Sequence, residues 1–169
     1  WAGPVVAAAA ILDPANIPSG INDSKKLTAG KREALYGEIM ACATIGIGQA
    51  SVEEIDSLNI LAATLLAMQP AVSSLSIPPD VALVDGNRAP KLSCQTHTII
   101  GGDAKCLSIA AASIIAKVTR DRLMAELARE FPGYGWEKNA GYGTAEHMAG
   151  IAAHGITPHH RRSFAPCRA

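Results

Sequence analysis

The sequence predicts an α/β protein, because short apolar runs typical of strands alternate with longer stretches of helical periodicity. The chain has 169 residues, enough for one domain with a sizeable core, and 49% of them are hydrophobic. We find no internal repeat and no low-complexity linker. We therefore expect residues 1–169 to form a single domain.

Composition narrows the range of functions. The formal net charge is zero, so only a local basic patch would indicate binding of nucleic acid. The four cysteines are scattered without a C-x-x-C pair, which favours reduced thiols in a cytoplasmic protein over a zinc site or a disulfide framework. We expect no membrane span, because the sequence lacks a run of about 18 apolar residues.

Four segments are predicted as strands. Residues 5–12 are a continuous apolar run, and residues 44–51 alternate in the manner of a half-buried strand. VALVD at residues 81–85 is a short buried strand that ends in a carboxylate, and THTIIGG at residues 96–102 is another.

Three helices are predicted with clear ends. Thr28 is placed to cap a helix over residues 29–42. A long helical pattern covers residues 104–130 and ends before Pro132, and its middle is almost entirely small or aliphatic. Thr144 begins a last helix that Gly155 ends.

A fourth helical region lies between the second and third strands. The tetrapeptide SVEE at residues 51–54 is a capping box, which opens a helical stretch. We expect Asp56 or Ser57 to cap the main helix that follows. Pro70 should kink or end that helix.

Two aspartates stand at positions suited to chemistry. Asp85 ends an apolar strand and precedes Gly86, whereas Asp103 follows another strand and two glycines. Ligands of α/β proteins collect at such strand ends, and two carboxylates there suit Mg²⁺ or Mn²⁺. The alternative is that Asp103 only caps the helix that begins there.

Lysines and arginines supply local positive charge at Lys25, Lys26, Lys117 and Arg120. Such groups belong more often to a solvated surface than to a site. Lys117 and Arg120 differ, because they lie three residues apart on the helix whose start carries Asp103. A cation on that face would hold a phosphate near a metal ion.

Tyr142 lies in the glycine-flanked loop NAGYGT, at the start of the last helix. Its ring is suited to stacking on a base or sugar, although a core tyrosine that closes a turn has the same pattern. His147 and His154 raise the separate alternative of a zinc site with His159 and His160. The tight spacing typical of such sites is absent.

Seven stretches of the sequence together resemble ribonuclease HII, the type 2 ribonuclease H. They occur in that family's order and cover nearly the whole chain, so their joint match is far more specific than any one motif. The stretches are AGPVVAAAAIL, NDSKKLT, EEIDSLNILAATLLAM, LVDGNRAPKL, GGDAKCLSIAAASIIAKVTRD, YGWEKNAGYGTAEH and HHRRSFAP.

This resemblance implies a ribonuclease H-like mixed sheet flanked by helices, with a helical C-terminal extension. It implies an endonuclease that cuts 5′ to ribonucleotides, in RNA–DNA hybrids and at single ribonucleotides embedded in duplex DNA, leaving 5′-phosphate and 3′-hydroxyl ends. The family uses four carboxylates with Mg²⁺ or Mn²⁺, and Asp85 and Asp103 match the third and fourth. Tyr142 matches the tyrosine that stacks at the RNA–DNA junction. We expect a monomer.

The family's first two carboxylates form an Asp-Glu pair in an Asp-Glu-x-Gly-x-Gly motif. That motif lies directly upstream of the segment matching WAGPVV, and the sequence begins after it. We expect a chain of these residues alone to lack its first strand, which is central in this fold, and to be impaired in metal binding and stability. One alternative is a catalytically inactive nucleic-acid-binding module. Another is a type 3 enzyme, against which Tyr142 argues.

Overall fold

The structure is a computed structural model that describes residues 1–168. It divides into two compact units. The strand unit comprises residues 6–49 and 64–118, and the C-terminal unit comprises residues 1–5, 50–63 and those from 119 onward. The expected single domain stays a prediction, and each unit is described separately below. No helix of the described residues is long and apolar enough to cross a membrane.

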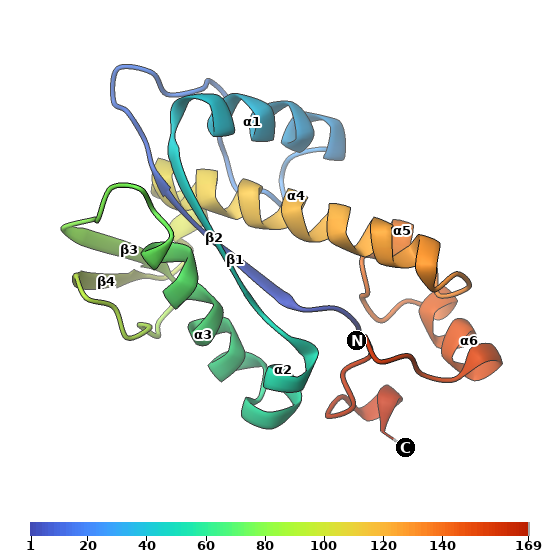
Figure 1. Cartoon of the computed structure of the whole chain (residues 1–169). Coiled ribbons are helices and arrows are strands. Elements are labelled where there is room, and N and C mark those ends of the chain that lie inside the picture. Colours follow the sequence, from blue (N-terminus) through green and yellow to red (C-terminus); the bar gives the residue numbers. More distant parts are fainter. Residues whose placement is uncertain (169) are drawn as a thin grey trace. The chain divides into compact units, whose positions relative to one another are not determined.

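Strands and helices alternate along the chain, which confirms the predicted α/β class (Figure 1). The strands are β1 (Val5–Ile11), β2 (Thr44–Ala50), β3 (Val81–Asp85) and β4 (Gln95–Ile99). The α-helices are α1 (Ala29–Cys42), α2 (Val52–Leu58), α3 (Ile60–Ser73), α4 (Leu107–Glu130), α5 (Trp136–Asn139) and α6 (Ala145–His154). Two short 3₁₀ helices are η1 (Gly102–Ala104) and η2 (Ala165–Cys167).

The core of the strand unit lies between the β1–β2 sheet and the helices α1 and α4. Leu35 and Ile39 of α1 are buried against Ile114 and Ile115 of α4. Complete burial of four such side chains contributes roughly 6–12 kcal/mol before the cost of ordering them. Thr28 accepts a hydrogen bond from the backbone N–H of Lys31, which confirms the predicted cap of α1.

Helix α3 packs against β2 on the opposite face of this sheet (Figure 1). A Cβ atom at Gly46 would overlap the carbonyl oxygen of Ala71, and one at Gly48 would overlap that of Ala67. The alternation seen in the sequence therefore has a steric cause. Glycine lets the backbone of α3 approach one face of the strand, while isoleucines such as Ile45 and Ile47 fill the core on the other.

Strands β3 and β4 form a second, separate two-stranded sheet. They are parallel, and Asp85 is paired with Ile99 at the end of the register. The segment after β4 turns back toward this end, where Gly86 N–H donates a hydrogen bond to the carbonyl of Ile99. The C-terminal ends of both strands thus lie together, as expected for ligand sites in α/β proteins.

The C-terminal unit has its own small core, built around Met124, Tyr134 and Trp136. Ala2 pairs with His160 in an isolated antiparallel bridge, so two distant segments of the sequence lie side by side there. Asp56 joins another pair of segments, because its carboxylate accepts hydrogen bonds from the backbone N–H groups of Arg162 and Ser163.

Two predicted helix starts are wrong, and Pro70 does not end its helix. Asn59, rather than Asp56 or Ser57, precedes the main helix, and its side-chain oxygen accepts from the N–H groups of the first turn. Pro70 lies inside α3, which continues to Ser73, and the kink expected there stays a prediction. The long helix α4 begins at Leu107 rather than at residue 104, because η1 occupies the preceding turn. The capping box at Ser51 and the cap at Thr144 are confirmed.

Candidate active site

Asp85 and Asp103 lie next to each other at the C-terminal end of the β3–β4 pair. One carboxylate oxygen of Asp85 accepts a hydrogen bond of 2.8 Å from the backbone N–H of Gly102, the residue directly before Asp103. A Cβ atom at position 102 would overlap the terminal Cδ1 atom of Ile109, so any larger residue there would need that side chain to shift. Asp103 lies in η1 and not in the first turn of α4, so the interpretation as a simple cap of that helix is not supported.

Lys25 forms an ion pair with Asp103. Its ammonium lies 3.5 Å from a carboxylate oxygen of Asp103. The Asp103 side chain is only 11% exposed, whereas Lys25 is 82% exposed, so the lysine reaches over the carboxylate from the solvent side. Lys26 is exposed at the next position. The structure therefore brings Lys25, Asp85 and Asp103 into one region of the strand unit.

The donor set at this end of the sheet fits part of a divalent-cation site. Carboxylate oxygens are the ligands that hard cations prefer, and two of them are present. Within residues 1–168, however, no group of three or more histidine, cysteine, aspartate or glutamate side chains lies close enough to hold a metal ion. The described residues thus place two carboxylates in this region without a third possible ligand beside them.

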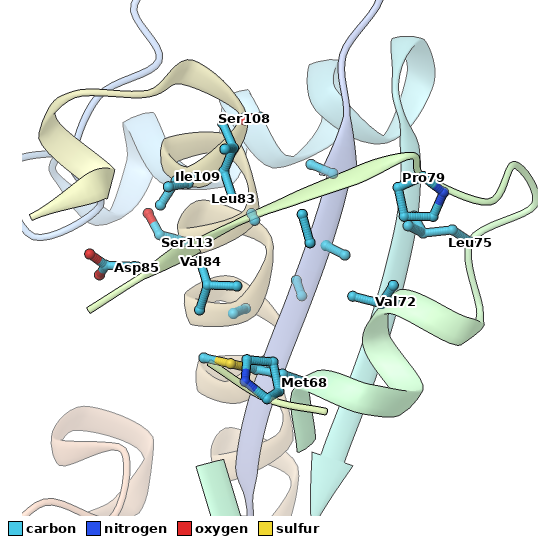
Figure 2. Close-up of a pocket in the computed structure, with 18 of the residues that line it drawn as sticks. Met68, Val72, Leu75, Pro79, Leu83, Val84, Asp85, Ser108, Ile109 and Ser113 are labelled. Carbon is cyan, nitrogen blue, oxygen red and sulfur yellow. The ribbon is translucent and has the colours of Figure 1, made fainter. Parts of the chain in front are cut away.

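A cavity of about 470 Å³ adjoins Asp85 (Figure 2). Consecutive residues of two strands line it, residues 6–12 on one side and residues 81–85 on the other. Side chains of one strand alternate between its two faces, so an unbroken series of lining residues means that the edges of β1 and β3 flank the cavity. Met68 of α3 and Ile109 of α4 contribute to its remaining walls.

The other predicted contacts belong to the C-terminal unit. Tyr142 is 57% exposed, and the guanidinium carbon of Arg120 lies 5.8 Å from the centre of its ring. Arg120 donates hydrogen bonds to the backbone carbonyls of Pro4, Ala2 and Ala140, and its burial lowers its pKa. The guanidinium therefore contacts both the Tyr142 ring and the backbone of the loop at Ala140.

Lys117 lies one turn before Arg120 in α4, but its surroundings differ. It is half-buried and belongs to the strand unit, whereas Arg120 belongs to the C-terminal unit. The predicted joint phosphate contact of these two residues stays a prediction.

Sequence reasoning missed a buried cluster behind Tyr142. His147 and His160 are completely buried, and their Nε2 atoms are 3.0 Å apart. The indole N–H of Trp136 donates to His147 Nε2, also at 3.0 Å. Since the described residues form no metal-ligand group, the zinc alternative for these histidines finds no support. The sequence grouped these histidines only as possible zinc ligands, and their spacing gave no sign of a buried hydrogen-bonded pair.

Comparison with known proteins gives consistent matches. The family model described as Ribonuclease HII matches residues 1–167. A Ribonuclease HII of Ruegeria pomeroyi is 60% identical over 164 residues, which are 96% of this chain and 70% of that protein.

Solved structures of the same kind of enzyme also match this chain. The ribonuclease H2 of Pyrococcus horikoshii has a TM-score of 0.77 at 28% identity, covering 99% of this chain and 89% of that one. The PCNA:RNase HII complex of Archaeoglobus fulgidus matches with a TM-score of 0.75 at 26% identity, covering 95% and 87%.

Proposed function

Because the chain belongs to the ribonuclease HII family, we propose that it is built to hydrolyse the phosphodiester bond 5′ to ribonucleotides. The substrates we propose are RNA–DNA hybrids and duplex DNA with single embedded ribonucleotides, and the products carry 5′-phosphate and 3′-hydroxyl ends. The observation that carries this proposal is the placement of Asp85 beside Asp103 at one end of the β3–β4 pair.

Asp85 and Asp103 are the residues that would hold a divalent cation, Mg²⁺ or Mn²⁺. Such a cation activates a water molecule and stabilises the leaving oxygen in phosphodiester hydrolysis. The Gly102 N–H fixes the orientation of the Asp85 carboxylate, so this ligand is oriented before any cation arrives. Lys25 lies beside Asp103 and places a positive charge where the substrate's phosphate backbone would approach.

Tyr142 is the residue we propose for reading the RNA–DNA junction. Its ring is exposed and supported by Arg120, which leaves an aromatic face for stacking on a base or sugar. Selecting RNA over DNA further requires a group that reads the 2′-hydroxyl.

We propose that full activity needs carboxylates in addition to Asp85 and Asp103, carried on a further strand. Three observations support this: the incomplete ligand set, the separate two-stranded sheets, and the cavity flanked by the edges of β1 and β3. One strand pairing with both edges would satisfy their backbone groups and would pass beside Asp85. A polypeptide of residues 1–169 alone is then expected to bind metal weakly.

A cleavage assay tests both statements. The substrate is a DNA duplex with one ribonucleotide, with Mg²⁺ or Mn²⁺, and an all-DNA duplex is the control. The polypeptide of residues 1–169 is compared with a version that carries an Asp-Glu-x-Gly-x-Gly strand before Trp1. We expect only the extended version to cut, on the 5′ side of the ribonucleotide. Cleavage by the short version would contradict the need for further carboxylates.

The second candidate function is a catalytically inactive module that binds nucleic acid. The incomplete ligand set favours it, because two carboxylates alone do not hold a metal pair. If neither version cuts and both bind the duplex, this candidate replaces the first. We further propose a monomer in solution, which sedimentation of the purified protein would test.

A further inference from the structure

The backbone N–H and the backbone carbonyl of Tyr142 are both hydrogen-bonded within the C-terminal unit. The N–H of Tyr142 donates to the carbonyl of Asn139 at 2.9 Å. The Tyr142 carbonyl lies 2.9 Å from the N–H of Thr144 and 3.0 Å from Nδ1 of His147. Ala140 has a φ of 48°, a left-handed conformation that costs free energy in a residue with a Cβ atom. The surroundings therefore hold this loop in a conformation that it would not prefer alone.

The two buried histidines have only one arrangement of protons that satisfies every contact. The backbone N–H of Thr157 donates to Nδ1 of His160 at 2.9 Å, so that nitrogen carries no proton, and the Thr157 hydroxyl, 3.0 Å from the same nitrogen, is then a donor as well. The proton of neutral His160 is then on Nε2, which faces Nε2 of His147. His147 Nε2 accepts from His160 and from Trp136, so the His147 proton is on Nδ1 and is donated to the Tyr142 carbonyl.

A protonated form of either histidine would break this chain of hydrogen bonds. A proton on His147 Nε2 would face two N–H donors, and a proton on His160 Nδ1 would face the Thr157 N–H. Burial, followed by the mutual repulsion of the pair, lowers the pKa of His160 to about 4, and burial lowers the pKa of His147 as well. Other titratable groups that face the pair are His159, Tyr134 and the amino group of Trp1.

We propose that the His147–His160 pair is a positioning element that sets the Tyr142 ring for recognition of the RNA–DNA junction, with His147 as the specificity-determining residue. His160 contacts His147, and His147 Nδ1–H in turn donates to the backbone carbonyl of Tyr142, the residue that carries the exposed ring. This inference rests on the proposed role of Tyr142 in stacking on the substrate. It adds to that role the residues that hold the ring in place.

Two substitutions at one position separate the two halves of the network. The amide nitrogen of an asparagine lies near the place of Nδ1, so His147→Asn keeps a donor for the Tyr142 carbonyl. The amide oxygen of a glutamine lies near the place of Nε2, so His147→Gln keeps an acceptor for Trp136 and His160 and loses the donor. A purely structural role predicts the opposite order of damage, because His147→Asn loses two of the three contacts of this side chain and His147→Gln loses one.

The first readout is the nitrogen NMR of the unmodified protein, which needs no variant. We expect the proton of His147 on Nδ1 and that of His160 on Nε2. The second readout is the ratio of the Kd for an all-DNA duplex to the Kd for the same duplex with one ribonucleotide. We expect His147→Asn to keep this ratio within twofold, and His147→Gln to lose it to the same extent as Tyr142→Ala.

Each outcome decides the matter. A proton on His147 Nε2 overturns the proposal, as does a His147→Gln protein that keeps the ratio while Tyr142→Ala loses it. If Tyr142→Ala leaves the ratio unchanged, the proposed role of Tyr142 fails. The role of His147 in positioning the loop is then tested by NMR of Tyr142. Its amide and ring resonances should shift in His147→Gln and stay near those of the unmodified protein in His147→Asn.

Discussion

The end of β3 and the Tyr142 loop solve the problem of placing a functional group in opposite ways. Asp85 is exposed at the end of a short strand, and its carboxylate is oriented by the single N–H of Gly102. Tyr142 is also exposed, but its backbone is tied to Asn139, Thr144 and a buried histidine. The first region is open to additional ligands, whereas the second has almost every polar group already paired.

This difference shows that a different free-energy cost governs each region: the cost of burying a charge at the strand end, and the cost of ordering a side chain in the loop. Asp85 stays near solvent, because burying its charge without a partner would cost several kcal/mol, whereas the less exposed Asp103 has Lys25 as its partner. A ring that must present one face to a substrate is best held rigid, since ordering it at the moment of binding would reduce affinity. The variants below test the two regions separately, from the largest expected effect to the smallest.

The largest effect is expected from Asp85→Asn in a version of the protein that cleaves. Removing one charged ligand should lower kcat more than about 100-fold, while the Kd for the duplex changes less than twofold. The matched control is Asp80→Asn, which makes the same change in an exposed residue just before the other end of β3. Retained turnover in Asp85→Asn would remove this residue from the mechanism.

The next effect concerns the scaffold of the loop. Asn139 is buried and bonds to the Tyr134 carbonyl, the Thr144 hydroxyl and the Gly141 N–H. We expect Asn139→Ala to lower the free energy of unfolding by about 2–3 kcal/mol, because buried groups lose their partners.

Tryptophan fluorescence during urea unfolding measures this loss, since Trp1 and Trp136 both lie in the C-terminal unit. Asn16→Ala, at an exposed position of the strand unit, is the control and should change stability by less than about 0.5 kcal/mol. An equally small loss in Asn139→Ala would show that the loop does not depend on this side chain.

A third, smaller effect should appear in the pH dependence of stability. The pKa of His160 falls from 6.5 in the unfolded chain to about 4 in the folded one, because the ring is buried and faces His147. The unfolded state therefore binds more protons between these values, so stability is highest above pH 6.5 and declines as the pH falls toward 4. The expected loss reaches about 2 kcal/mol by pH 5.

Unfolding free energies of the unmodified protein and of His160→Asn, measured from pH 7.5 to 4, test this. The variant keeps an acceptor for the Thr157 N–H and should show a shallower decline. His97→Asn, an exposed position in β4, should leave the decline unchanged. Parallel curves for the unmodified protein and His160→Asn would contradict a linkage through His160.

The smallest effect is expected at the Lys25–Asp103 ion pair. Because Lys25 is largely exposed, Lys25→Met should change stability by less than about 0.5 kcal/mol. Its expected effect is on nucleic-acid affinity, which should fall about twofold at low salt and converge with that of the unmodified protein at high salt. Lys26→Met, at the neighbouring exposed position, is the control. Equal losses for both lysines would show that Lys25 acts only through the general charge.

Local signals in the sequence predicted most elements of the fold and much of the strand-end site. Apolar runs predicted the strands, and the side-chain oxygens of Thr28, Ser51 and Thr144 predicted the starts of three helices. The start of α3 was misplaced, because Asn59 was not recognised as a cap between two adjoining helices. The position of Asp85 was predicted because it ends an apolar strand, although its contacts with Ile99 and Gly102 come from a later segment of the chain.

Tertiary structure alone decided what surrounds Tyr142. Arg120 had the spacing of a phosphate contact, yet its guanidinium lies on the carbonyls of Pro4 and Ala2 from the opposite end of the chain. His147 and His160 are thirteen residues apart and share no periodicity. Only the fold of the C-terminal unit brings their Nε2 atoms to within 3.0 Å of each other. Helix and strand propensities depend on neighbouring residues, so they can be predicted from the sequence. Buried hydrogen-bond networks join distant segments, so only the folded chain determines them.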